Sequence, residues 1–209
     1  MPTFDIIMVT WNRVEYTKRT VASLISSGAF EQCQRFIVVD NYSLESGMKE
    51  FIDALRHYQK TFVITRPKND GWATAVNDGL GLSRAEYVLI INNDVEFQPD
   101  FIKEMFHAYN SQLPTDKKIG IVGVWSHTSH AFVTNGITTQ FFREMDNVPA
   151  VGWLIPKSAM EKVGMLTEKG PHPERGGNGE DTDYVMRMKQ TGYLTGVTAR
   201  DVGTHITGY

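Results

Sequence analysis

The first half of the sequence alternates short apolar runs with segments of helical periodicity, and this order limits the fold more than any other feature. Each run is short, rich in β-branched residues and nearly unbroken by polar residues, which is typical of parallel strands covered by helices on both faces. The repeated order of strand and helix therefore predicts an α/β fold with a parallel sheet. The four predicted strands are Asp5–Thr10, Arg35–Asp40, Thr61–Thr65 and Tyr87–Ile91. The predicted helices are Val14–Ser27, Gly47–Tyr58, Ala73–Ser83 and Pro99–Tyr109.

The second half is less regular, and its predicted strands and helices do not repeat in a fixed order. Asn135–Gly136 favours a tight hairpin turn, so the apolar stretch around it is expected to fold back there. A length of 209 residues fits one domain. The predicted elements are strands at Ile119–Trp125, Ala131–Phe142 and Val151–Pro156, helices at Lys157–Val163 and from about Glu180, and a Gly/Pro-rich loop at 165–179.

Composition limits the partners of the chain. The formal net charge is −3, so no overall basic field draws it to nucleic acid or to an anionic membrane. No apolar run approaches the roughly 20 residues that span a bilayer, and the N-terminus MPTFDIIMVTW lacks the positive charge of a signal peptide. A single cysteine, Cys33, cannot form an intrachain disulfide. These features favour a cytoplasmic protein in which Cys33 is a small, partly buried hydrophobe.

Polar side chains stand at the ends of three of the four predicted parallel strands. In open α/β sheets, ligands bind beyond the carboxyl ends of the strands. A single polar ending is explained by a turn, but three on one rim of a sheet predict a binding site. The sequence contains neither G-x-G-x-x-G nor G-x-x-x-x-G-K-[ST], so neither a dinucleotide site nor a P-loop is supported. The three endings are Thr10–Trp11–Asn12, Asp40–Asn41 and Asn92–Asn93–Asp94.

Two further groups of polar residues have competing interpretations. Glu180, Asp181 and Asp183 crowd the start of a predicted helix, where negative charge also suits the helix dipole. A glycine-rich segment precedes them, as a mobile segment of an active site requires. His205 lies near the end of the sequence, where a single histidine is more often structural or exposed than a ligand. Neither group identifies a catalytic site by itself.

Six segments, spread over nearly the whole chain, are similar in order and character to those of one known family. They are VTWNR, IVVDNYS, NDGWATAVNDGLGLSRAEYVLIINNDVEFQPDFI, VGWLIPKSAMEKVGMLTE, GEDTDYVMRMKQTGY and THITG. These segments resemble the strands, the acidic motifs and the terminal histidine of family 2 glycosyltransferases. The resemblance implies one GT-A domain over residues 1–209, a Rossmann-like mixed, mostly parallel sheet sandwiched between helices. Its nucleotide-binding half would be 1–94 and its acceptor-binding half 95–209.

The resemblance also implies a sugar transferred from a nucleotide diphosphate to an acceptor hydroxyl with inversion, assisted by a divalent cation that neutralises the departing diphosphate. Asp94 matches the metal ligand of the family, and His205 matches its terminal histidine. Asn92 stands where the family has an aspartate, so it supplies no charge. An oxygen-rich site of this kind favours Mn²⁺ or Mg²⁺. Positions that match donor-binding residues are Thr10, Asn12, Asp40, Asn69, Asn77, Asn92 and Asn93.

On the acceptor side, the resemblance implies a general base that takes the proton of the attacking hydroxyl. Asp181 is the predicted base, Glu180 would position the acceptor or a metal-bound water, and Asp183 would support the helix. Gly152 and Trp153 are expected beside the sugar or acceptor, although a buried tryptophan is the simpler interpretation of Trp153.

The substrates stay open at this level. The donor nucleotide is UDP, GDP or dTDP, and the acceptor hydroxyl is of unspecified class, held by region 125–153, by the loop at 165–179 or by a partner subunit. The oligomeric state is equally open. Two alternatives compete with transfer: a nucleotidyltransferase, which would normally have a glycine-rich loop where this chain has VTWNR, and a non-catalytic nucleotide-sugar or glycan-binding module, which Asn92 favours.

Overall fold

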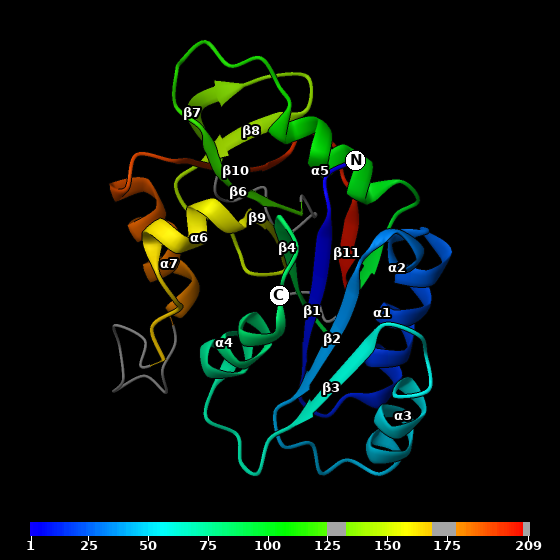
Figure 1. The fold of residues 1–209 in the computed structure, drawn as a ribbon. Coiled ribbons are helices and arrows are strands. Elements are labelled where there is room, and N and C mark those ends of the chain that lie inside the picture. Colours follow the sequence, from blue (N-terminus) through cyan, green and yellow to red (C-terminus); the bar gives the residue numbers. More distant parts are fainter. Residues whose placement is uncertain (125–132, 169–178, 207–209) are drawn as a thin grey trace.

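A computed structural model of the chain describes residues 1–124, 133–168 and 179–206, and at 133–135 it describes only the backbone. Within these residues, a nine-stranded sheet has the order β3-β2-β1-β4-β9-β6-β10-β8-β7 (Figure 1). Its strands are β1 (Phe4–Thr10), β2 (Arg35–Asp40), β3 (Thr61–Thr65), β4 (Tyr87–Asn92), β6 (Ile119–Gly123), β7 (Val133–Thr138), β8 (Phe142–Met145), β9 (Gly152–Pro156) and β10 (Leu194–Thr198). A separate two-stranded sheet pairs β5 (Val95–Phe97) with β11 (Gly203–His205).

The first four strands of the large sheet are parallel, as their apolar runs predict. β1 pairs in parallel with β2 and with β4, and β2 pairs in parallel with β3. β9 is inserted antiparallel between β4 and β6, and β10 runs parallel to β6. β8 and β7 complete the edge as antiparallel strands. The predicted α/β class is confirmed, with a mixed sheet whose parallel part is built by the first half of the chain.

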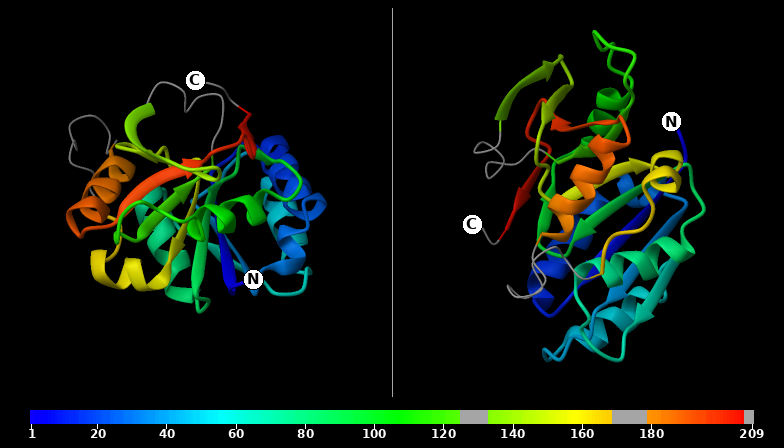
Figure 2. Two further views of the ribbon diagram at one scale, coloured as in Figure 1. Left: turned by 90° about the horizontal axis from the view of Figure 1, so that it is seen from above. Right: turned by 90° about the vertical axis from the view of Figure 1, so that its left-hand side faces the viewer.

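Helices cover both faces of the large sheet (Figures 1 and 2). They are α1 (Val14–Ser26), α2 (Ala29–Gln32), α3 (Met48–Leu55), α4 (Trp72–Leu82), α5 (Phe101–Tyr109), α6 (Lys157–Val163) and α7 (Glu180–Gln190). Ile6 and Met8 pack on the face covered by α1, α2, α3 and α5, whereas Ile7 and Val9 pack on the face covered by α4, α6 and α7. Successive strand residues point to opposite faces, so β1 is buried throughout. No helix of the described residues has the length and apolar character to cross a bilayer.

The second half differs from its prediction at the hairpin. Asn135–Gly136 lies inside β7, and the chain turns at residues 139–141 instead. The Thr139 hydroxyl accepts hydrogen bonds from the backbone N–H groups of Phe141 and Phe142, at 3.3 and 3.0 Å, and this local arrangement fixes the turn. The predicted position of the turn is therefore wrong by a few residues. Residues 125–132 and 169–178, which belong to predicted strands and to the Gly/Pro-rich loop, lie outside the described residues.

The antiparallel pairing of β10 with β8 depends on Gly196. A Cβ at this position would lie 2.6 Å from the Phe142 ring and would also collide with the carbonyl oxygen of Arg143. Because backbone cannot move aside easily, we expect Gly196→Ala to lower the free energy of unfolding by about 2 kcal/mol or more. Gly81→Ala in α4 is the matched control, since nothing lies within 4 Å of that Cβ position. Urea unfolding measures both variants, and equal losses would contradict this packing.

Cys33 offers a second test of the core. Its Sγ lies 3.2 Å from the carbonyl oxygen of Phe30, and burial raises the pKa of the Cys33 thiol to about 11. The thiolate is the reactive form, so at pH 8 only about one thiol in a thousand is ionised. We expect reaction with an aromatic disulfide reagent to be slow in buffer and fast in urea. Since the raised pKa favours the protonated thiol in the folded state, its contribution to stability is complete below about pH 8.5 and is lost as the pH rises toward 11. Equal labelling rates in buffer and urea would contradict the burial.

Candidate functional site

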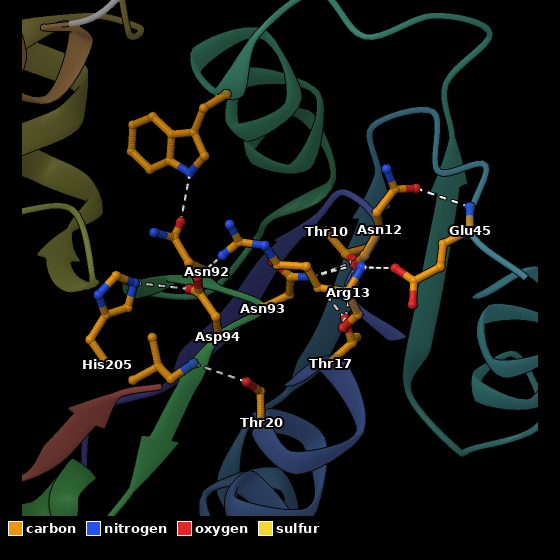
Figure 3. Close-up of polar contacts among 12 residues, drawn as sticks. Thr10, Asn12, Arg13, Thr17, Thr20, Glu45, Asn92, Asn93, Asp94 and His205 are labelled. Atoms are coloured by element: carbon orange, nitrogen blue, oxygen red, sulfur yellow. Dashed lines mark hydrogen bonds and ion pairs between the residues drawn. The ribbon is translucent and has the colours of Figure 1, made fainter. Parts of the chain in front are cut away.

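The small sheet places Asp94 and His205 side by side. Asp94 directly precedes β5, and His205 ends β11, where it pairs with Val95. The backbone N–H of Ile206 donates to the carbonyl oxygen of Asp94 at 2.8 Å. Nε2 of His205 consequently lies 3.2 Å from Oδ1 of Asp94, and the two side chains are 7% and 10% exposed (Figure 3). The two predicted metal-ligand residues, distant in the sequence, therefore converge.

Arg13 reaches the same carboxylate from the turn that follows β1. Its Nη1 lies 3.0 Å from Oδ2 of Asp94, so this carboxylate is flanked by an imidazole and a guanidinium. Asn12 and Arg13 both adopt left-handed backbone, with φ angles of 55° and 58°. Each such conformation costs on the order of 1–3 kcal/mol, and residues of this kind cluster at ligand sites. Arg13 is missing from the predicted site residues, although its place after the polar ending of β1 pointed to this rim.

Glu45 holds the strained turn in place. Its carboxylate accepts hydrogen bonds from the backbone N–H groups of Arg13 and, at 3.3 Å, Val14, the first residue of α1. Oδ1 of Asn12 in return accepts from the backbone N–H groups of Leu44 and Glu45, at 2.8 and 3.1 Å. The loops after β1 and β2 are thus joined reciprocally. Asn12 was predicted to bind the donor, but its side-chain oxygen is hydrogen-bonded to the loop after β2.

Asn93 points inward beneath the same turn. Its amide nitrogen lies 3.1 Å from the Thr10 hydroxyl, 2.8 Å from the Thr17 hydroxyl and 2.9 Å from the carbonyl oxygen of Asn12. Thr10 is fully buried and Asn93 nearly so. Both were predicted to contact the donor. In the structure their side-chain polar atoms hold β1, β4 and α1 together.

A cavity of about 290 Å³ opens at the carboxyl ends of β1, β2 and β4. Two amides in its lining are hydrogen-bonded to each other: Nδ2 of Asn41 donates to Oδ1 of Asn69 at 2.8 Å. Asp40 is buried nearby, and its carboxylate accepts the backbone N–H of Ser43 at 3.2 Å. Asn77 lies elsewhere, because its amide bonds both backbone groups of Leu166, at 2.9 and 3.1 Å. The lining residues are Val9, Trp11, Arg13, Asn41, Asn69, Trp72, Asn92, Asn93 and Asp94.

The opposite end of β4 carries no predicted site residue. A larger cavity of about 480 Å³ opens there beside Tyr87, Lys118 and Lys162. Size alone does not identify a ligand site, and ligands of open α/β sheets bind at the carboxyl ends of the strands. The smaller cavity, which contains Asp94, is therefore the candidate site.

Trp72 connects this rim to the core, and its role was missed because the sequence only shows it at the start of a helix. Its indole N–H donates to Oδ1 of Asn92 at 2.9 Å. Its ring meets Trp153 edge to face, with 5.8 Å between the ring centroids, and Trp153 stacks on Tyr184 at 6.1 Å. Burial raises the pKa of Tyr184 to about 12, so its hydroxyl stays protonated. These aromatic contacts link the cavity to α7.

Trp153 and Gly152 are core residues. The Trp153 side chain is fully buried, and its N–H donates to the carbonyl oxygens of Val148 and Pro149, at 3.2 and 2.9 Å. A Cβ on Gly152 would lie 2.9 Å from the Val124 side chain. The expected contact of these two residues with a sugar or acceptor does not fit this burial, and the simpler interpretation of a buried tryptophan holds.

Glu180 and Asp181 lie in the first turn of α7. Oδ1 of Asp181 accepts the backbone N–H of Thr182 at 2.7 Å, and no hydrogen bond to its other oxygen comes from residues 1–124, 133–168 or 179–206. Asp183 pairs with Arg187 at 2.9 Å, one turn along, and thus supports the helix. The aromatic contacts described above join this helix to the cavity.

Comparison with known proteins gives the family. The model of the family described as glycosyl transferase family 2 matches residues 5–147. The chain belongs to that family. It is 27% identical over 126 residues to the poly(ribitol-phosphate) beta-N-acetylglucosaminyltransferase TarP of Staphylococcus aureus (strain N315), a match that covers 59% of this chain and 38% of TarP. It is also 27% identical over 114 residues to the putative colanic acid biosynthesis glycosyl transferase WcaA of Escherichia coli (strain K12), covering 54% of this chain and 40% of WcaA.

Solved structures of GT-A glycosyltransferases share the fold. The mannosyltransferase PcManGT from Pyrobaculum calidifontis, in complex with GDP-Man and Mn²⁺, matches with a TM-score of 0.73 at 16% identity, over 98% of this chain and 57% of its own. GalNAc-T7 with UDP, GalNAc and Mn²⁺ matches with a TM-score of 0.76 at 13% identity, over 98% of this chain and 43% of its own. The matched regions span about two fifths of the two sequence relatives.

The Asp94–His205 pair fits a sparse cation site. Among the described residues, no group of three or more His, Cys, Asp and Glu side chains forms a complete set of metal ligands. One carboxylate oxygen and one imidazole nitrogen nevertheless converge at 3.2 Å, and a bound diphosphate with water would have to supply the other ligands that Mn²⁺ or Mg²⁺ requires. Asn92 does not add to the set, because its oxygen is bonded to Trp72.

Glu45 can be tested without a ligand. Removal of its carboxylate leaves the backbone N–H groups of Arg13 and Val14 without their acceptor. We expect Glu45→Ala to lower the free energy of unfolding by about 1–2 kcal/mol. Glu15→Ala removes an exposed carboxylate from α1, the helix whose first N–H groups Glu45 binds. Because Glu15 makes an exposed ion pair with Lys18, its loss should cost less than about 0.5 kcal/mol. Denaturant unfolding compares the two, and equal values would contradict the capping role.

Proposed function

We propose that this chain is the catalytic domain of an inverting glycosyltransferase that moves a sugar from a nucleotide-diphosphate donor to an acceptor hydroxyl, with a divalent cation. The observation that carries the proposal is the convergence of Asp94, His205 and Arg13 beside the 290 Å³ cavity of a family 2 fold. Neighbours of the same fold were solved with GDP-Man or UDP and with Mn²⁺, which supports a nucleotide donor and a cation here. The whole chain, 1–209, forms one GT-A domain in this proposal, with 1–94 binding the nucleotide and 95–209 the acceptor.

The donor half of the site handles negative charge. Asp94 and His205 would hold the cation, which when bound neutralises the charge that grows on the departing diphosphate. Arg13 is hydrogen-bonded to Asp94. Its guanidinium would therefore lie close enough to the cation site to pair with a phosphate oxygen. Asn41 and Asn69, two of the four amides that line the cavity, would contact the nucleoside.

The acceptor half needs a base. In an inverting reaction the acceptor oxygen attacks the anomeric carbon from the face opposite the diphosphate, the bond from that carbon to the diphosphate oxygen breaks, and the hydroxyl proton passes to a base. Asp181 is proposed as this base, because its carboxylate lies at the start of α7 and, within the described part of the chain, only one of its two oxygens is hydrogen-bonded. Glu180, beside it, would position the acceptor.

A second function is favoured by one observation. Asn92 replaces an acid, and Arg13 already pairs with Asp94, so the site carries less negative charge than a cation would select. This arrangement suits a module that binds a nucleotide sugar without transferring it. The two proposals differ in turnover, since both require donor binding.

The donor can be found by thermal shift. We expect one of the UDP, GDP or dTDP sugars to raise the melting temperature in the presence of Mn²⁺, because ligand that binds only the folded state stabilises it. Asp94→Asn should remove most of that shift; because the substitution also breaks the ion pairs with Arg13 and His205, each shift is measured from the melting temperature of the same ligand-free variant. No shift with any nucleotide sugar would overturn the proposed donor site.

Turnover separates the enzyme from the binding module. With the donor identified, we expect Asp181→Asn to lower the rate of sugar transfer, or of donor hydrolysis in the absence of acceptor, by about 10²- to 10⁴-fold with donor affinity unchanged. Asp183→Asn makes the same change on the same helix at a residue that pairs with Arg187, and should keep its rate. An unaltered rate in Asp181→Asn would remove Asp181 from the mechanism, and donor binding without turnover in the unaltered protein would favour the module.

A further inference from the structure

The side chain of Asn92 has a fixed orientation, and Trp72 fixes it. The indole N–H can only donate a hydrogen bond, so the amide atom that it meets at 2.9 Å must be the oxygen. Nδ2 of Asn92 is therefore the atom that points away from Trp72. A flipped amide would bring two N–H groups together and lose a partly buried hydrogen bond, so the flipped orientation is disfavoured.

Trp72 is itself held firmly. Its ring meets Trp153 edge to face at 5.8 Å with 85° between the ring planes. Trp153 is fully buried and stacked on Tyr184, so the surface against which Trp72 rests is part of the core. The indole N–H thus reaches Asn92 from a rigid position and does not follow the amide if the amide turns.

The free end of Asn92 belongs to the cavity that contains Asp94. Asn92 is half-buried and lines this cavity together with Arg13. Among residues 1–124, 133–168 and 179–206, no acceptor is bonded to Nδ2 of Asn92. Asp94 is the single carboxylate among the described residues that line the cavity. Position 92 accordingly presents N–H groups to whatever enters.

We propose that Trp72 is a positioning residue that makes Asn92 a hydrogen-bond donor to a diphosphate oxygen of the nucleotide, in place of a metal ligand. This inference rests on the proposed donor site. Two consequences follow from charge. First, with an amide at 92 and a guanidinium at 13, the cavity can hold a diphosphate in the absence of a cation. Second, the affinity of the cavity for a free cation is low, because Asp94 is the single carboxylate in its described lining.

A double-mutant cycle tests the role of Trp72. Trp72→Phe keeps an aromatic ring and removes the N–H; Asn92→Ala removes the amide. Calorimetry with UDP, GDP and dTDP in EDTA identifies the nucleotide that the unaltered protein binds. We expect Trp72→Phe to weaken its binding by about 3- to 10-fold, and to have no further effect in the Asn92→Ala background. Equal losses in both backgrounds mean that Trp72 acts through packing alone, and overturn the inference.

Asn92→Asp tests the role of position 92 with two readouts. The carboxylate would accept from Trp72 with one oxygen and present the other to the cavity. In EDTA we expect nucleotide affinity to fall further than in Asn92→Ala, because of charge repulsion. Binding of free Mn²⁺, followed by electron paramagnetic resonance without nucleotide, should tighten by about 10-fold. Unchanged values in both measurements overturn the assignment of Asn92 as a donor.

The outcomes keep this inference apart from the proposed function. Melting temperatures of the ligand-free variants identify those that are misfolded; if Trp72→Phe is among them, Trp72→Met removes the indole N–H with a large apolar side chain that has no hydrogen-bond donor. Failure of the unaltered protein to bind any of the three nucleotides, with or without Mn²⁺, overturns the donor site itself. Normal binding by the unaltered protein, together with unaltered binding by Trp72→Phe, overturns only the positioning role.

Discussion

The pairing of β5 with β11 is the interaction on which the site depends. Each strand has three residues, yet their contact brings the end of the described chain to the acidic motif that follows β4. The backbone bond from Ile206 to Asp94 continues the pairing by one residue and sets the distance between the carboxylate and the imidazole. Without this pairing, the His205 imidazole would not lie beside the Asp94 carboxylate, and the proposed cation would lose one of its two protein ligands.

The polar residues at the rim of the sheet form two groups, one that holds the strand ends together and one that lines the cavity. Thr10, Asn12 and Asn93 turn their hydrogen-bonding groups toward neighbouring loops and α1, where they hold the ends of the strands in register. Asn92 and Asp94 line the cavity, as Asn93 also does in part, and they present polar atoms to it. The first group makes the second possible, because a buried polar group without a partner would be costly, and its bonds keep the rim rigid around the ligand-facing side chains.

The parallel half of the sheet was predictable because its signal is local. Apolar runs marked β1 to β4 within about a residue of their observed ends, and the strand endings located the rim. The pairing of β5 with β11 carries no comparable signal, since three-residue strands show no periodicity. The contact of Arg13 with Asp94 depends on two left-handed residues, and the contact of Trp72 with Asn92 depends on packing against Trp153. Neither contact could be predicted from the spacing of residues in the sequence. Trp153 is an example of the opposite kind. Tryptophan often contacts ligands, but this one is fully buried within β9 and is not available to a ligand.

The left-handed pair Asn12–Arg13 also limits how this sequence can diverge. Asparagine is among the non-glycine residues that tolerate such backbone best, whereas β-branched residues are nearly excluded from it. A lineage that lost the Arg13 guanidinium could replace it with few residue types without also deforming the turn that Glu45 anchors. Drift at these two positions is therefore restricted by main-chain geometry. Because that geometry favours glycine and asparagine over arginine, an arginine retained at position 13 would reflect the chemistry of its guanidinium.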